Sequence, residues 1–247
     1  MTRLMYRSLT VSVVIPAFNE QRAIGPTVRT IPEWVDRVIV VDDCSSDETS
    51  ANAREALGDR AGEVIRHAQN RGVGGAISTG YRRTLELGLD VAVVMAGDGQ
   101  MDPDDLPALL DPIADDTADY VKGNRFKHPE IWSAMPPSRI FGNVLLSAAT
   151  RVTSGYRHVF DSQCGYTAIH RRALLRIPLD ALWTRYGYPN DLLSRLAIAQ
   201  SRVVDVPVRP IYGEHWKSGI NLGTAIHPIP YVLLRSWGNR IAAQLRK

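Results

Sequence analysis

The sequence has few cysteines, no long apolar run and little net charge, and each shortage argues against a class of protein. Its two cysteines, Cys44 and Cys164, lie far apart, so neither a disulfide framework nor a zinc knuckle is expected. No uncharged apolar stretch reaches the roughly 18 residues of a membrane span, and no signal-peptide pattern precedes the first strand. A formal charge of +3 gives no reason to expect nucleic acid binding. We therefore expect a soluble or peripheral protein of a reducing, cytoplasmic compartment.

The first half of the chain alternates strand-length apolar runs with helical spacing. Strands are predicted at Val11–Ile15, Arg37–Val41, Glu63–Arg66 and Val91–Met95. Helices are predicted at Arg22–Thr30, after an N-cap at Ser46, along Ile77, Tyr81 and Leu85, and at Leu106–Ile113. This alternation predicts right-handed crossovers, and so an α/β fold with a mainly parallel central sheet flanked by helices.

The second half is less regular. We predict a helix at Ser138–Thr153, a strand at Tyr166–His170, a helix from an N-cap at Asn190 to Ala199, and a strand at Arg202–Val206. The chain of 247 residues has no convincing linker. We therefore expect one α/β domain over residues 1–224, followed by a helical appendage over residues 225–247.

Three of the predicted strands end in unusual polar loops. PAFNE follows the first strand, DDCSSDET the second and AGDGQMDP the fourth. In a parallel sheet the carboxyl ends of the strands meet at one edge, which is where ligands bind. One polar loop would be ordinary, but three at the same edge indicate a binding site.

The turn after the fourth strand carries oxygen ligands at every second residue, at Asp98, Gln100 and Asp102. Such ligands on a tight glycine turn can converge on a hard divalent cation, which binds few carboxylates together with substrate phosphates. Asp102 followed by Pro103 fits instead the N-cap of the next helix. We therefore predict Asp98 and Gln100 as the metal ligands.

Five segments occur in the order VVIPAFNE, VIVVDDCSSDET, NRGVGGA, VVMAGDGQMDP and GNRF. Together they resemble the family 2 glycosyltransferases of GT-A fold, and most of all the branch that transfers mannose or glucose to dolichyl or polyprenyl phosphate. The resemblance covers about Val11 to Val208. It implies an enzyme that uses a nucleotide-sugar donor and Mg²⁺ or Mn²⁺.

The resemblance also implies roles by position. The nucleotide-sugar is expected against Pro16, Phe18, Glu20, Asp42, Asp43, Gly74 and Asp98, with Asp98 and Gln100 on the metal. An acceptor phosphate is expected against Arg125, Arg139, Lys217 and Ser218, the last two in a loop that is basic and mobile in the family. Asp161 matches an acidic position facing the reaction centre. One departure is Ala96, which stands where the family's D-x-D motif has its first aspartate and removes one metal or ribose contact.

The acceptor decides what further groups the chemistry needs. A phosphate monoester is already anionic and needs positioning by arginine forks rather than a base. A hydroxyl acceptor would need a base, for which Asp161 and Asp191 are the candidates, although Asp191 equally fits an acid that stabilises the first turn of its helix.

We therefore expect a hexose to move, with inversion, from a GDP- or UDP-linked donor to a polyprenyl or dolichyl phosphate. One alternative keeps the fold and takes a hydroxyl of a glycan or small molecule as acceptor. The other is a catalytically weak nucleotide-sugar-binding subunit, for which Ala96 is the argument.

The tail from Ile229 to Lys247 carries a stripe of Leu234, Trp237, Ile241 and Leu245, with arginines on other faces. This pattern is typical of a helix lying in a membrane interface. A helix packed on its own domain or on a partner subunit fits equally well. The tail thus predicts peripheral attachment at the cytoplasmic face of a membrane, a membrane-protein partner or a homo-oligomer.

Overall fold

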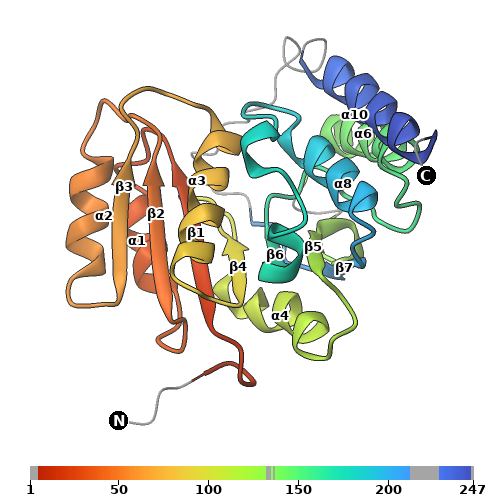
Figure 1. Ribbon diagram of the computed structural model, residues 1–247. Helices are drawn as coiled ribbons and strands as arrows, with labels where there is room; N and C mark the ends of the chain where they lie inside the picture. The colour runs from red at the N-terminus through yellow and green to blue at the C-terminus, as the bar shows by residue number, and fades with distance from the viewer. Residues whose placement is uncertain (1–4, 132–134, 136, 212–227, 246–247) are drawn as a thin grey trace.

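A seven-stranded sheet runs through the molecule (Figure 1). The computed structural model describes residues 5–131, 135, 137–211 and 228–245, with the backbone alone for residues 137–139. The strands are β1 (Val11–Ala17), β2 (Arg37–Asp42), β3 (Gly62–Arg66), β4 (Val91–Val94), β5 (Tyr120–Asn124), β6 (Thr167–His170) and β7 (Val203–Pro207). Their spatial order is β3-β2-β1-β4-β6-β5-β7, and only β6 runs antiparallel to its neighbours.

The central strands are buried on both faces, which explains their continuous apolar runs. In β1, Val13 and Ile15 belong to the core on one face of the sheet, and Val14 belongs to the core on the other. Val38 and Ile39 of β2 divide between the two cores in the same way. The strict alternation of side chains along a strand therefore supplies both cores from a single run of β-branched residues.

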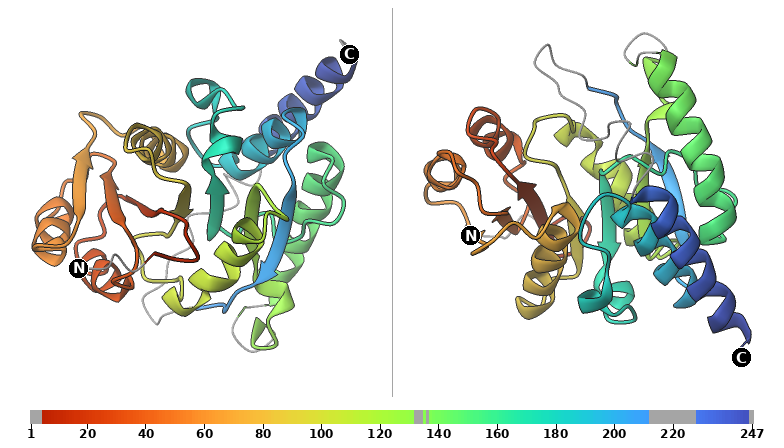
Figure 2. Two further views of the ribbon diagram at one scale, coloured as in Figure 1. Left: turned by 60° about the horizontal axis from the view of Figure 1, so that its bottom comes forward. Right: turned by 90° about the horizontal axis from the view of Figure 1, so that it is seen from above.

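Helices cover both faces of the sheet (Figure 2). Residues from α1 (Ile24–Thr30), α2 (Thr49–Leu57) and α4 (Leu106–Ala114) line the first core. Residues from α3 (Val73–Glu86), α7 (Arg171–Leu174) and α8 (Tyr188–Ile198) line the second. Short 3₁₀ turns lie at η1 (Pro103–Asp105), η2 (Arg125–Lys127) and η3 (Leu179–Ala181).

Two further helices, α6 (Pro137–Ser154) and α10 (Ile229–Leu245), lie at the end of the molecule opposite β3 (Figures 1 and 2). The helix α10 packs against both α8 and α6. None of the helices in the described ranges combines the length and the apolar character that a membrane span requires.

The predicted mainly parallel α/β fold is confirmed, but two predicted helix starts are wrong. Ser46 does not cap α2, which begins at Thr49, where the Asp47 carboxylate accepts hydrogen bonds from the backbone N and the hydroxyl of Thr49. Asn190 does not cap α8, which begins at Tyr188 after a glycine in the left-handed region. Asn190 instead faces inward and accepts a hydrogen bond from the Thr150 hydroxyl.

Candidate active site

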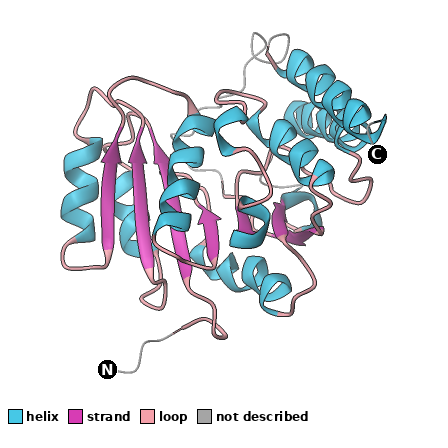
Figure 3. Cartoon of the chain, in the orientation of Figure 1, coloured by secondary structure: helices cyan, strands magenta, loops and turns pink. Residues whose placement is uncertain are grey.

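The three polar loops do follow the carboxyl ends of parallel strands at one edge of the sheet. In Figure 3 the arrowheads of β1, β2 and β3 lie together, and the shorter β4 points the same way. β1 lies between β2 and β4, with Ala17 level with Asp42. Beyond the end of β4, Gly97 N donates to Pro16 O over 3.3 Å, which ties the third loop to the first. After β1 the chain forms β2 on one side of β1, and it later returns to form β4 on the other side of β1. This edge is therefore a topological switch point, the usual ligand site of open α/β sheets.

The Asp42 carboxylate organises the second loop. It is fully buried, accepts from Ser45 N over 2.9 Å and from the Ser50 hydroxyl, and lies 3.7 Å from the Arg66 guanidinium. These partners hold the loop after β2 in one shape. Asp42 thus shapes the wall of the site through the backbone that it holds.

The Asp43 carboxylate ties the second loop to the glycine-rich segment before α3. Its Oδ1 accepts from Arg71 N over 2.8 Å, and its Oδ2 accepts from Gly72 N over 2.7 Å. His67 Nδ1 lies 2.7 Å from Asp43 Oδ1, and His67 Nε2 lies 2.9 Å from the Thr79 hydroxyl. This buried network fixes the start of α3 beside the loop. His67 was not predicted as a site residue, although its place directly after β3 at the same edge was a usable signal.

Glu20 and Asp98 form an acidic pair from the loops after β1 and β4. Burial raises the pKa of the Asp98 carboxyl, whose Oδ1 accepts from Gln100 N over 3.1 Å. Burial, and then the charges of Asp98 and Asp47, raise the pKa of Glu20 to about 6. Two desolvated carboxylates that repel one another form an environment that a bound cation would relieve.

The chemistry of this turn fits a divalent cation that also takes ligands from a substrate. Among the described residues, no three His, Cys, Asp or Glu side chains gather into a metal cluster. A cation held by Asp98 and Gln100 would therefore complete its shell with phosphate oxygens and water, as Mg²⁺ commonly does. Asp102 belongs to the next turn, as predicted. Its Oδ1 accepts from Asp104 N over 3.0 Å, with Pro103 at the first position.

Of the remaining predicted donor residues, Pro16 and Phe18 lie at the same edge, and Gly74 lies in the first turn of α3. Phe18 is 48% exposed at the end of β1, so its ring is open to a ligand, while Pro16 is half-buried beside Val41. Gly74 is covered, because an added Cβ would lie 2.3 Å from Trp183 O. The structure thus gives a packing reason for this glycine, which lets the chain at Trp183 lie directly on the start of α3.

Arg125 and Asp161 form a buried ion pair at the carboxyl end of β5. Asp161 accepts from Arg125 N over 3.0 Å, from Arg125 Nε over 2.8 Å and from Arg125 Nη2 over 2.8 Å. Burial raises the pKa of this fully buried carboxyl, but the charge and hydrogen bonds of Arg125 outweigh burial and bring the pKa below its ordinary value. The fork of Arg125 is thereby fixed in orientation.

A third charged group, Lys122, lies beneath this pair. Its side chain is fully buried, and its Nζ donates to Cys164 O. Burial lowers the pKa of the Lys122 amine, while the charge of Asp161 acts in the opposite direction. The charges of Lys122 and Arg125 both act on Asp161, and the charge of Asp205 also acts on Lys122. Lys122 was not predicted as a site residue, because β5 was not predicted from the sequence.

Asp161 adopts a φ of +51°, in the left-handed region. Asn19 and Cys44, in the loops after β1 and β2, have φ values of +56° and +67°. Such a conformation is uncommon for residues other than glycine and tends to occur at functional sites. It turns the chain at Asp161 so that the carboxylate meets Arg125.

The other predicted acceptor residues are less well defined. Arg139 lies in the first helical turn of α6, and nothing is described of its side chain. Lys217 and Ser218 lie outside the described residues. α6 nevertheless reaches the site further along, because Ser162 N, next to Asp161, donates to the Ser147 hydroxyl over 3.0 Å.

Asp191 lies away from this cluster, in the packing between α8 and α10. It is 1% exposed, and its Oδ2 accepts from Trp183 N over 2.9 Å and from Arg195 Nε over 2.8 Å. Its Oδ1 lies 3.7 Å from Arg235 of α10. The contact with Arg195 one turn further along favours the alternative reading of Asp191, as an acid that stabilises its own helix.

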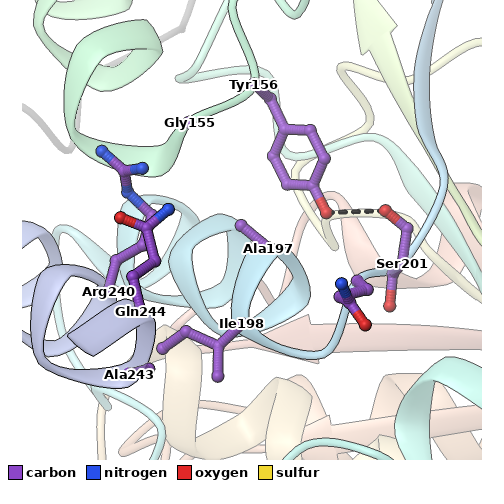
Figure 4. Close-up of a pocket in the computed structure, with 9 residues that line it drawn as sticks. Gly155, Tyr156, Ala197, Ile198, Ser201, Arg240, Ala243 and Gln244 are labelled. Atoms are coloured by element: carbon purple, nitrogen blue, oxygen red, sulfur yellow. Dashed lines mark hydrogen bonds between the residues drawn. The ribbon is translucent and has the colours of Figure 1, made fainter. Parts of the chain in front are cut away.

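A separate hollow lies between the end of α6, α8 and α10 (Figure 4). Tyr156, Ser201, Arg240 and Gln244 are among its lining residues, and the Tyr156 hydroxyl donates to Ser201 O over 2.7 Å. No predicted site residue lines this hollow. The hollow therefore lies apart from the candidate site at the edge of the sheet.

Comparison with known proteins identifies the family. Residues 12–177, well over half the chain, match the sequence model of glycosyl transferase family 2. The chain belongs to this family. The predicted resemblance is thereby confirmed, and the protein is a glycosyltransferase.

Two relatives of this glycosyltransferase align over most of their length. A UDP-N-acetylglucosamine–dolichyl-phosphate N-acetylglucosaminyltransferase of Methanococcus voltae is 34% identical over 217 residues, covering 82% of this chain and 86% of the relative. An undecaprenyl-phosphate mannosyltransferase of Micrococcus luteus is 33% identical over 238 residues, covering 93% and 94%.

A solved structure supports the GT-A fold of the glycosyltransferase. Glucosyl-3-phosphoglycerate synthase of Mycobacterium tuberculosis, crystallised with Mn²⁺, UDP and glucosyl-3-phosphoglycerate, superposes with a TM-score of 0.70. The alignment covers 94% of this chain and 81% of that chain at 23% identity. At that identity the similarity bears on the fold alone.

Proposed function

We propose that this glycosyltransferase moves a hexose from a GDP- or UDP-linked donor onto the phosphate of a polyprenyl or dolichyl phosphate. The observation that carries the proposal is the fixed Arg125 fork at the end of β5, held by the buried Asp161. The acidic turn after β4 is two strand positions away, a spacing of roughly 10 Å. Two relatives are named for dolichyl phosphate and undecaprenyl phosphate, the same class of acceptor.

The donor would bind at the loops after β1, β2 and β4. In this proposal the base lies against Pro16 and the exposed ring of Phe18, and the loops held by Asp42 and Asp43 form its wall. Asp98 and Gln100, with Glu20 nearby, would hold Mg²⁺ or Mn²⁺ on the diphosphate. A cation there neutralises charge on the departing nucleoside diphosphate. The Mn²⁺ and UDP bound by the fold relative are consistent with this arrangement.

The transfer itself would be a direct displacement. An acceptor phosphate oxygen attacks the anomeric carbon from the face opposite the diphosphate, and the new C–O bond forms as the old one breaks. The sugar is inverted, and the nucleoside diphosphate leaves with the bonding electrons. The attacking oxygen is already anionic, so positioning and charge compensation suffice. The Asp161 carboxylate, held by Arg125 with a lowered pKa, is poorly suited to accept a proton.

A transfer assay tests the proposal directly. Tritiated GDP- and UDP-sugars are incubated with a short, water-soluble polyprenyl phosphate, with Mg²⁺, with Mn²⁺ or with a chelator. We expect an acid-labile glycosyl phosphate from one donor, and no product with the chelator. Transfer only to hydroxyl acceptors, or binding of donors without transfer to any acceptor, would refute the proposal.

Arg125→Lys tests the role of the guanidinium group, because lysine keeps the positive charge and lacks the planar pair of donors. We expect KM for the acceptor to rise about tenfold, with donor affinity unchanged. Arg82→Lys, at a half-buried arginine paired with the exposed Asp180, is the matched control. Charge reversal at Arg125 is unsuitable, since it would set a second carboxylate against the buried Asp161.

A further inference from the structure

The helix α6 has its apolar side turned outward. Phe141, Leu145 and Val152 are 72%, 63% and 68% exposed, and they recur at helical spacing along one side. The opposite side contributes buried hydroxyls, among them Ser147 and Thr150. A surface helix of a globular protein ordinarily has the reverse arrangement.

The helix α10 has the same arrangement on its outer side. Leu234, Trp237, Ile241 and Leu245 are all exposed, Leu245 at 83%. A different side of α10, which includes Val232, is buried against the domain. The stripe predicted from the sequence is therefore not the surface that packs α10 onto its own domain.

The two outward sides are neighbours. Arg240 of α10 donates from Nε to Thr153 O over 3.0 Å and from Nη2 to Val152 O over 3.1 Å. This brings the turn that carries Ile241 beside the last turn of α6, and the two helices lie side by side in Figures 1 and 2. We call the combined surface the outer face, formed by Phe141, Val144, Leu145, Val152, Leu234, Trp237, Ile241 and Leu245. Large contiguous apolar surfaces on a protein mark interaction sites.

The two chain segments that carry the outer face have charges of one sign. Residues 137–160 and 229–247 contain seven of the 29 lysines and arginines of the chain and none of its 26 aspartates and glutamates. The rest of the chain therefore carries a net negative charge. Exposed Arg151 and Arg157 belong to this basic set. A cationic surface with an apolar stripe complements anionic lipid, whereas two copies of it would repel one another.

We propose that the outer face docks this glycosyltransferase on a bilayer of anionic phospholipid. The apolar side chains enter the headgroup boundary, and the arginines contact the lipid phosphates.

The outer face connects to the site through α6. The Ser147 hydroxyl of α6 accepts a hydrogen bond from Ser162 N. Ser162 directly follows Asp161, whose carboxylate accepts hydrogen bonds from Arg125. A docked α6 would hold the acceptor arginine close to the lipid surface, where a polyprenyl phosphate presents its head group. This last step rests on the proposed function, whereas the docking itself does not.

Vesicle sedimentation of the full chain tests the docking. Phosphatidylcholine vesicles are compared with vesicles of phosphatidylcholine and phosphatidylglycerol in equal parts. We expect binding to the anionic vesicles alone, weakened by added salt. The double variants Phe141→Ser/Leu145→Ser and Leu234→Ser/Ile241→Ser should each lose about tenfold in vesicle affinity. Leu175→Ser, which changes a leucine of 67% exposure at the end of α7, should bind as the wild type.

Melting temperatures show whether the variants fold, and exposed positions should tolerate serine. The proposal is overturned if folded double variants bind anionic vesicles as tightly as the wild type. It is also overturned if the wild type forms a lipid-free dimer that the same changes dissociate. Both double variants should retain wild-type transfer to the short soluble acceptor. Failure of that transfer in the wild type, with vesicle binding intact, would refute the proposed function and leave the docking standing.

Discussion

Glu20 and Asp98 on the donor side of the candidate site and Asp161 on its other side lie in opposite surroundings. On the donor side, Glu20 and Asp98 lie near one another, and no ion pair with a lysine or arginine is found for either within the described part of the chain. On the other side, at the carboxyl end of β5, Asp161 pairs with Arg125 of the chain itself. The first arrangement raises carboxyl pKa values, and at Asp161 the second lowers the pKa.

This contrast indicates which charged groups are available to a bound ligand. Burying charged carboxylates without a cationic partner destabilises the folded state, and a bound cation restores that stability. A carboxylate that is hydrogen-bonded to an arginine instead fixes the orientation of the guanidinium group. The donor side is thus suited to a metal-bound diphosphate, and the acceptor side to an anion without a metal. The following substitutions test each half of this contrast.

The largest effect is expected from Asp98→Asn. Transfer should fall by roughly 10²–10³-fold, since the variant loses a charge that positions the cation at the leaving group. Thermal stability should hold or rise, because burial already disfavours the charged carboxyl. The measurements are kcat at saturating Mn²⁺ and the melting temperature. Asp104→Asn, at an exposed aspartate six residues further on, is the control and should stay at the wild-type rate. A wild-type rate in Asp98→Asn would remove Asp98 from the metal site.

A large effect on stability is expected from Asp161→Asn. Breaking a buried ion pair costs about 3–5 kcal/mol, because it leaves the remaining charge uncompensated. The folded pKa of Asp161 lies below its ordinary value, so its contribution is complete above the unfolded pKa of about 3.9 and is lost as pH falls below that.

Urea unfolding at pH 7 and under acid conditions checks this second prediction. The gap between Asp161→Asn and the wild type should narrow as the solution becomes more acidic than about pH 4. Asp180→Asn removes an exposed partner of Arg82 and should change stability by less than about 1 kcal/mol. A gap that stays constant across this range would mean that the carboxylate charge does not stabilise the fold.

The smallest effect is expected on stability, when one glycine on each side is replaced by alanine. Gly74→Ala sets a Cβ 2.3 Å from Trp183 O, a backbone atom, and should destabilise the fold by about 1–3 kcal/mol. Gly142→Ala, on α6, meets nothing within 4 Å and should stabilise the helix by roughly 0.5–1 kcal/mol. Melting temperatures of the two variants should therefore shift in opposite directions. Shifts in the same direction would contradict the close packing at Gly74.

The strands and loops of the donor side could be predicted from the sequence, although the start of α2 and the place of His67 could not. Its strands are continuous apolar runs that end in polar loops, and the order of crossovers brings those loops together without any distant contact. Asp98 and Asp102 could even be separated, because the proline after Asp102 marks a helix start. Local pattern and global fold agree there.

Less of the acceptor side could be predicted from the sequence. β5 was missed because Lys122 interrupts its apolar pattern, and the antiparallel direction of β6 leaves no mark in its four residues. The pairing of Arg125 with Asp161 joins residues 36 positions apart, through a left-handed turn that the sequence does not signal. The α6 helix was predicted, but periodicity alone cannot say which of its sides faces solvent.

The left-handed residues Asn19, Cys44 and Asp161 have a consequence for how this enzyme can change. Each holds a conformation that costs of order 1 kcal/mol relative to glycine. Glycine at Cys44 would therefore release strain and favour a more heat-tolerant protein, while glycine at Asp161 would remove the carboxylate that the turn serves to present. At Asp161, selection for stability alone would therefore act against the geometry of the site.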